Sequence, residues 1–117
     1  MKEKTREDSQ RIAAFLEEHS CKDVTVMDLE NCSWTDCFVV GTVNSVGHLK
    51  GVVHQIWGLL NGLGLSVTNR HKNPGEDGWT LIDTGDIVIH LMSQELRDFY
   101  SLEKLWKSYE ESAGSDD

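Results

Sequence analysis

The stretch that most constrains the fold is the apolar run from Ile87 to Met92, which follows an Asp-Thr-Gly-Asp turn at residues 83–86. A strand of that length without alternating polar residues presents apolar side chains on both faces, so both faces must be covered. A second apolar run, residues 79–82, precedes the turn and predicts an antiparallel hairpin. The chain must therefore build a layered fold around a sheet with a buried interior strand.

An amphipathic helix and further strands are predicted ahead of the hairpin. The helix spans residues 5–19, where apolar residues recur at helical spacing, and Thr5 with Asp8 is expected to form a capping box at its start. Three segments rich in β-branched or apolar residues predict strands at 23–29, 37–43 and 65–68.

A second helix is predicted over residues 46–63, with Asn44-Ser45 as its N-cap and Gly62 or Gly64 as its stop. Its apolar residues fall on one broad face and are expected to meet the sheet: Val46, Leu49, Val52, Val53, Ile56, Leu59, Leu60 and Leu63. Three glycines inside it are unfavourable for a helix, and close packing on the sheet is one explanation for them: Gly47, Gly51 and Gly58.

The order of these elements predicts an α/β (α+β) fold, a mixed five-stranded sheet with helices on both faces. The strand at 37–43, the helix and the strand at 65–68 should form a parallel crossover. We expect one domain over residues 1–117, with an ordered core from about 5 to 107. A polar loop is expected at Asn69–Gly78 and an acidic tail at 110–117.

The charge balance argues for a protein partner. The net charge is −9, from 20 acidic and 11 basic residues, so free binding to a nucleic acid backbone is not expected. Acidity of this degree instead favours docking onto a basic protein. No apolar run approaches the ~20 residues of a membrane span, and the N-terminus lacks an apolar signal region. Three cysteines without a Cys-x-x-Cys pair favour a reduced, cytoplasmic setting.

Catalytic chemistry finds little support in the residues. Asp36, Asp83 and Asp86 near strand ends leave open a metal-dependent nucleotidyltransferase, although aspartates beside a turn more often cap backbone groups. His90 is expected to be a core histidine. His48 and His54 are six residues apart and share no helix face, so we expect no metal site. The sequence also has no phosphate-binding glycine motif after a strand and no triad context around Ser33 or Ser45, so we expect no cofactor and no enzymatic activity.

The segment after the hairpin carries more apolar surface than one core requires. Its apolar residues spread around most of a helical wheel: Leu96, Phe99, Tyr100, Leu102, Leu105 and Trp106. Tyr and Trp dominate the binding energy of many interfaces. The residues alone therefore favour a partner-binding surface here over purely intramolecular packing.

Three stretches together resemble the ribosomal silencing factor family (RsfS, also called Iojap): SWTDCFVVGTVNSVGHLK at 33–50, GWTLIDTGDIVIHLM at 78–92 and RDFYSLEKLW at 97–106. They occur in the family's order and, with the intervening elements, cover nearly the whole chain. Gly47 and the segment at 71–74 depart from the family's pattern, whereas the last two stretches follow it closely. The resemblance implies a nucleotidyltransferase-like topology without the catalytic residues.

The resemblance also implies a translation repressor that acts on the ribosome in the cytoplasm. Such a factor binds the large ribosomal subunit through its protein fourteen and sterically blocks joining of the small subunit. An assembly role on the large subunit and a homodimeric free state are alternatives that the sequence leaves open. The implied site residues are Trp79, Tyr100, Leu102, Leu105 and Trp106, with Asp98 and Glu103 as a supporting rim.

Overall fold

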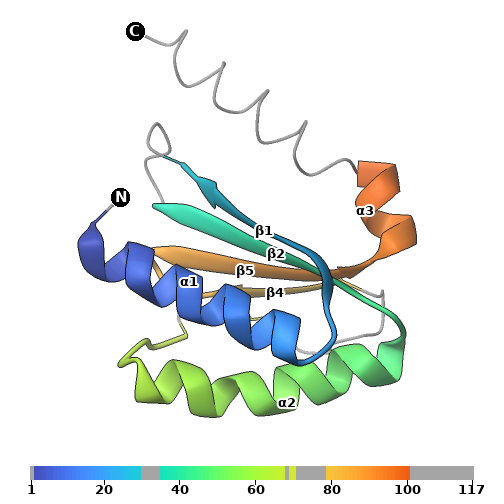
Figure 1. The fold of residues 1–117 in the computed structure, drawn as a ribbon, viewed down its shortest axis with the longest axis horizontal. Helices are drawn as coiled ribbons and strands as arrows, with labels where there is room; N and C mark the ends of the chain where they lie inside the picture. Colours follow the sequence, from blue (N-terminus) through green and yellow to red (C-terminus); the bar gives the residue numbers. More distant parts are fainter. Residues whose placement is uncertain (1, 30–34, 68, 71–78, 101–117) are drawn as a thin grey trace, which may run out of the picture.

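The structure is a computed structural model that describes residues 2–29, 35–67, 69–70 and 79–100 (Figure 1). Its elements are, in chain order, α1 (Glu3–Glu18), β1 (Lys22–Asp28), β2 (Cys37–Val43), α2 (Val46–Gly62), β3 (Asn69–Arg70), β4 (Trp79–Asp83), β5 (Ile87–Ser93) and α3 (Gln94–Tyr100). The alternation of strands and helices gives the mixed α+β class that the sequence predicts.

The sheet is built around the two strands that the sequence marks as apolar throughout. The strand order is β1-β2-β5-β4-β3, and β2 and β5 pair in parallel at its centre. The β1–β2, β5–β4 and β4–β3 pairs are antiparallel. All seven residues of β2 and six of the seven in β5 are buried, which confirms that both runs are covered on both faces. The β4–β5 hairpin is also confirmed.

The predicted third strand is wrong in position and length. Four longer strands form the body of the sheet, and β3 has only two residues, at a position where the sequence predicts a loop. The Leu65 N–H donates to the Leu60 carbonyl at 2.9 Å, so the chain after α2 closes the helix end instead of starting a strand. The strand pairings make β3 run in the same direction as β2, but β3 lies at an edge of the sheet and is separated from β2 by β5 and β4.

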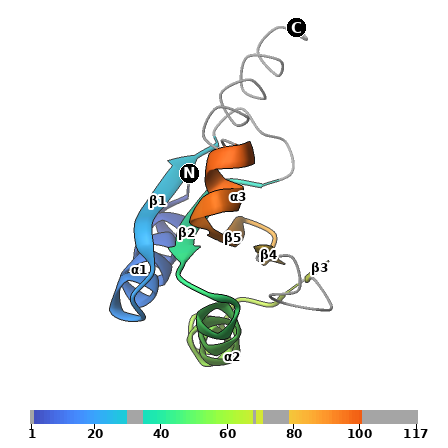
Figure 2. The ribbon, with the colours of Figure 1, turned by 90° about the vertical axis from the view of Figure 1, so that its right-hand side faces the viewer.

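Alternating side chains of the sheet divide the core between two faces. On one face, α1 and α2 cover β2 and β5 through buried residues that include Ile12, Leu16 and Ile56. On the other face, which we call the α3 face, Leu96 packs against a smaller cluster: Leu29, Phe38, Val40, Val88 and Met92. Figures 1 and 2 show α2 and α3 on opposite sides of the strands. Helices on both faces are therefore confirmed.

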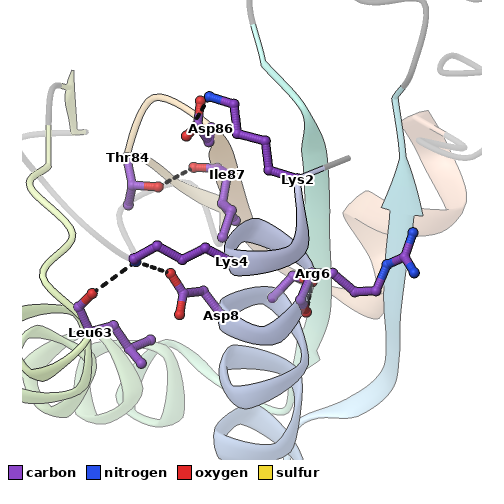
Figure 3. A network of polar contacts seen from close by, with 9 residues as sticks. Lys2, Lys4, Arg6, Asp8, Leu63, Thr84, Asp86 and Ile87 are labelled. Carbon is purple, nitrogen blue, oxygen red and sulfur yellow. Dashed lines mark hydrogen bonds and ion pairs between the residues drawn. The ribbon is translucent and has the colours of Figure 1, made fainter.

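The start of α1 differs from the predicted capping box. The helix begins at Glu3 with Lys2 as its N-cap, so Thr5 and Asp8 lie inside the helix, where both are buried. Lys4 Nζ donates to Asp8 Oδ2 at 2.6 Å and to the Leu63 carbonyl at 3.2 Å, which links α1 to the end of α2 (Figure 3). Asp8 therefore pairs with Lys4 inside α1 and does not cap the start of the helix, while Lys4 makes the contact to α2.

The ends of α2 follow the sequence, but two details of its surface do not. Ser45 Oγ accepts from the His48 N–H at 3.0 Å, and Gly64 takes a left-handed φ of 75° after the helix, as expected. Val46, predicted to face the sheet, is 46% exposed because the buried stripe begins one turn later. A Cβ built on Gly51 or Gly58 meets no atom within 4 Å, so packing on the sheet does not explain these glycines.

Candidate functional site

The predicted partner-binding residues belong to one end of the sheet where the structure describes them. The backbone of Trp79 opens β4 and is paired with Met92, two residues before α3 begins at Gln94. Tyr100 is the last residue of α3. The start of β4 and α3 therefore lie at the same end of the sheet. The remaining anchors Leu102, Leu105 and Trp106, the rim residue Glu103, and the side chains of Trp79 and Tyr100 lie outside the described residues.

Asp98 is the one predicted rim residue whose side chain the structure describes. It is exposed on α3, and its Oδ1 accepts a hydrogen bond from Gln94 Nε2 at 2.8 Å. This pairing of residues four apart supports the helix by a few tenths of a kcal/mol. The contact of Asp98 with a partner stays a prediction.

The short helix α3 is seated on the sheet by a cap and an apolar contact. Ser93 Oγ accepts from the Leu96 N–H at 3.2 Å, which satisfies one of the free donors at the helix start. Leu96 is half-buried against the apolar cluster of the α3 face. The direction of α3 is therefore set by what it touches on the sheet.

Arg97 supplies the polar part of that seat, and the sequence reasoning missed it. The side chain is 9% exposed, and Nη1 donates to the Asp23 carbonyl at 2.5 Å and to Thr42 Oγ1 at 2.9 Å. Nη2 donates to Thr25 Oγ1 at 3.2 Å. The acceptors come from β1 and β2, more than fifty residues away in the chain. The sequence did contain a signal for this role. Arg97 directly follows Leu96, in a segment that carries more apolar residues than one core requires.

His90 lies in the core, as predicted. It is 4% exposed in β5, and its ring meets that of Phe38 edge to face, with centroids 4.5 Å apart. Burial lowers the pKa of His90 from 6.5 to about 4, because the charged imidazolium is poorly solvated there. The imidazole is therefore neutral at physiological pH.

The hairpin carboxylates act as turn residues. Asp83 Oδ1 accepts from the Gly85 N–H at 2.8 Å, and Gly85 takes the φ of 96° that the turn needs. Asp86 is exposed and lies 4.0 Å from Lys2 Nζ, while its carbonyl accepts from the backbone of Asp36 and Cys37 (Figure 3). The Asp83 carboxylate therefore caps a backbone group as expected beside a turn, whereas the Asp86 carboxylate faces Lys2.

His48 and the described cysteines Cys21 and Cys37 are engaged in hydrogen bonds or packing. His48 Nδ1 accepts from the Asn44 N–H at 2.9 Å, which leaves Nε2 to donate to the His19 carbonyl at 2.6 Å. Burial raises the pKa of the Cys21 thiol to about 11 and that of Cys37 to about 12, which keeps both protonated. Within the described ranges, no group of three or more His, Cys, Asp or Glu residues could hold a metal ion. None of the helices in those ranges is long and apolar enough to cross a membrane.

Comparison with known proteins connects this architecture to one family. The family model described as "Ribosomal silencing factor during starvation" (RsfS) matches residues 2–117. The ribosomal silencing factor RsfS of Treponema pallidum is 36% identical over 98 residues, which cover 82% of this chain and 86% of that protein. The mouse protein "Mitochondrial assembly of ribosomal large subunit protein 1" is 33% identical over 102 residues, covering 85% of this chain. The match spans only 45% of the mouse protein's length.

A solved structure agrees with these sequence matches. The crystal structure of a Chromobacterium violaceum protein, 28% identical in sequence, superposes with a TM-score of 0.79 and covers 92% of this chain and 88% of that one. Because the family model matches almost the whole chain and the Treponema relative matches most of both proteins, the chain belongs to the ribosomal silencing factor family.

Proposed function

We propose that this protein binds the large ribosomal subunit through its protein fourteen and thereby keeps the small subunit from joining. The observation that carries the proposal is the meeting of Trp79 and α3 at one end of the sheet, where the register pairs Trp79 with Met92. The chain continues from α3 directly into the segment with Leu102, Leu105 and Trp106. The names of the family's members support the ribosomal partner.

The proposed mechanism is occlusion in the cytoplasm, without catalysis and without a cofactor. Apolar and aromatic anchors contribute most of the binding energy when they are fully desolvated in a partner's pocket. Asp98 and Glu103 pair with basic groups at the rim, where charges raise the association rate more than the affinity. The net charge of −9 steers the protein toward a basic surface. The body of the domain then occupies the space that the small subunit needs.

An assembly role is the second candidate, and one observation favours it. The mouse relative is named for assembly of the mitochondrial large ribosomal subunit. The same contact could then be made earlier, on immature large subunits. The two roles differ in the particle that is preferred. Silencing requires binding to finished large subunits, whereas assembly predicts tighter binding to incomplete particles.

Co-sedimentation with purified large subunits, small subunits and joined ribosomes tests the proposal. Wild-type protein should travel with the large subunit alone, and it should shift an equimolar mixture of subunits away from joined ribosomes. Tyr100→Ala/Trp106→Ala removes two aromatic anchors and should weaken binding by roughly 30-fold or more, the equivalent of about 2 kcal/mol or more. Tyr109→Ala, an aromatic substitution in the same segment but outside the proposed site, is the matched control.

Two results would contradict the proposal. If wild type and the folded double variant bind the large subunit equally well, the proposed site is wrong. If the protein binds joined ribosomes, the proposed occlusion mechanism is wrong. A thermal-shift measurement with nucleotides and Mg²⁺ tests the enzyme alternative, because a bound ligand must raise the unfolding midpoint. We expect no shift.

A homodimer that used the same aromatic anchors would compete with the ribosome. Sedimentation velocity over a range of protein concentrations measures that competition directly. If Tyr100→Ala/Trp106→Ala abolishes both self-association and binding to the large subunit, the two share a surface. If self-association survives while ribosome binding is lost, the dimer uses another face.

A further inference from the structure

We infer that Arg97 positions the proposed partner-binding segment by locking α3 to a bulge in β1, without contacting the partner itself. This inference rests on the proposed function and assigns a role to a residue outside the predicted site. Arg97 lies among exposed helix residues, yet its side chain is buried against the sheet. Its guanidinium is therefore directed to the inside of the protein, away from any surface that a partner could reach.

The receptor for this guanidinium is an irregular piece of strand. Between Lys22 and Thr25, β1 gains one residue relative to β2, because the register moves from Lys22↔Thr42 to Thr25↔Val40. Asp23 within this bulge has a φ of 49°, a left-handed conformation that non-glycine residues rarely adopt. Strained positions of this kind persist when the surroundings determine them and often serve function. Here the Asp23 carbonyl accepts the 2.5 Å hydrogen bond from Arg97 Nη1.

The contacts fix an orientation as well as a position. Nη1 and Nη2 are held on separate oxygens, Asp23 O and Thr42 Oγ1 for one nitrogen and Thr25 Oγ1 for the other. A planar guanidinium bound through two nitrogens cannot rotate freely, whereas a lysine ammonium could meet the same oxygens in many orientations. Because Arg97 follows Leu96 on the helix, the polar and apolar contacts together set the rotation of α3 about its axis.

The consequence for the site follows from the position of Tyr100 on α3. The described part of α3 runs from Gln94 to Tyr100, and the sequence continues with residues 101–106, which carry the anchors Leu102, Leu105 and Trp106. A tilt or rotation of α3 would displace Tyr100 relative to Trp79, which lies on β4. If α3 is correctly seated in only a fraction of the molecules, the apparent Kd for the partner rises by the inverse of that fraction.

Two measurements on the same set of variants test this inference. The set contains Arg97→Lys, Arg97→Met, Thr42→Val and the double variant Arg97→Met/Thr42→Val. Val53→Ala is the matched control, because it removes a buried side chain from the opposite face of the sheet and destabilises the fold without touching α3. Amide hydrogen exchange of the free protein reports the seating of α3, and co-sedimentation with purified large subunits reports affinity. Both are measured below the unfolding midpoint of every variant.

We expect Arg97→Met to accelerate exchange in α3, to leave β2 and β5 protected, and to weaken binding roughly tenfold or more, since hydrogen bonds to charged groups are lost. Arg97→Lys should be intermediate and Thr42→Val milder. The double variant should be no weaker than Arg97→Met alone, because Thr42 is expected to act through Arg97. Val53→Ala should lower the unfolding midpoint while binding stays at the wild-type level.

The outcomes separate this inference from the proposed function. If the wild type fails to travel with large subunits, the proposed function fails, and the positioning role falls with it. If the wild type binds and the folded Arg97→Met variant binds equally well, the inference is overturned while the proposed function stands. Equal loss of binding in Val53→Ala would also overturn it, because general stability would then explain the effect. Should Arg97→Met not fold, Thr42→Val and Arg97→Lys decide by the same criteria.

Discussion

Acidification should weaken the fold through His90. Burial lowers its pKa from 6.5 to about 4, whereas the unfolded chain exposes an ordinary imidazole. Between these two values the unfolded state binds more protons than the folded state, so the free energy of unfolding falls as the pH falls. The contribution of His90 is complete above pH ~6.5 and is lost progressively toward pH ~4.

The magnitude follows from the difference between the two pKa values. A shift from 6.5 to about 4 spans about 2.5 pH units, and at ~1.4 kcal/mol per unit the limiting loss is about 3 kcal/mol. At pH 5 about 2 kcal/mol of that loss should already have occurred. This is a large share of the ~5–15 kcal/mol that holds a typical domain together.

Urea denaturation at pH 7, 6 and 5 measures the effect on wild type and on His90→Gln, which keeps a polar side chain but does not titrate. Acidic groups common to both proteins cancel in the comparison. The stability advantage of wild type over His90→Gln should shrink by about 2 kcal/mol between pH 7 and pH 5. His54→Gln, at an exposed position of α2, is the control. It shows how much the replacement of any histidine changes the dependence of the free energy of unfolding on pH. If the difference in the free energy of unfolding between wild type and His90→Gln does not change with pH, the argument from burial is refuted.

Three further substitutions should change the thermal midpoint, measured by circular dichroism. Gly58→Ala should raise stability by about 1 kcal/mol, or about 4 °C, since the added methyl meets no atom within 4 Å; a lower midpoint would contradict this. Gly41→Ala should lower stability by about 1–3 kcal/mol, because the new Cβ would lie 3.2 Å from Leu16 Cδ1; an unchanged midpoint would mean that α1 yields freely. Ser45→Ala should cost about 1 kcal/mol, since the His48 N–H loses its acceptor, and Ser45→Asp should restore most of it.

The elements that could be predicted from the sequence are those decided by local pattern. The uninterrupted apolar runs of β2 and β5 require cover on both faces, and the structure buries them accordingly. The Ser45 cap and Gly64 stop of α2 rest on chemistry within a few residues. The family resemblance, carried by short motifs, is confirmed by the match over residues 2–117.

The parts that sequence reasoning missed depend on contacts between distant segments. Asp8 pairs with Lys4 within α1 instead of capping the helix, and Lys4 also donates to the Leu63 carbonyl at the end of α2, 59 residues away. The seat of Arg97 requires a bulge at Asp23, 74 residues away, and no local pattern identifies the Asp23 carbonyl as the acceptor. Of the candidate site, the structure describes the exposure of Asp98 and the backbone at Trp79 and Tyr100. The other anchors stay predictions.

The parallel pairing of β2 with β5 also has a consequence for how the chain folds. Cys37 lies opposite Ile87, a separation of 50 residues (87 − 37), so the central pair of the sheet closes one of its longest loops. Such non-local pairing slows folding toward the ~millisecond-to-second range. During synthesis β2 has only β1 beside it until β5 is made, and its other edge exposes free backbone groups that invite pairing with other chains. A chain that stops before residue 87 therefore keeps this edge of β2 unpaired, and we expect it to aggregate in the cell.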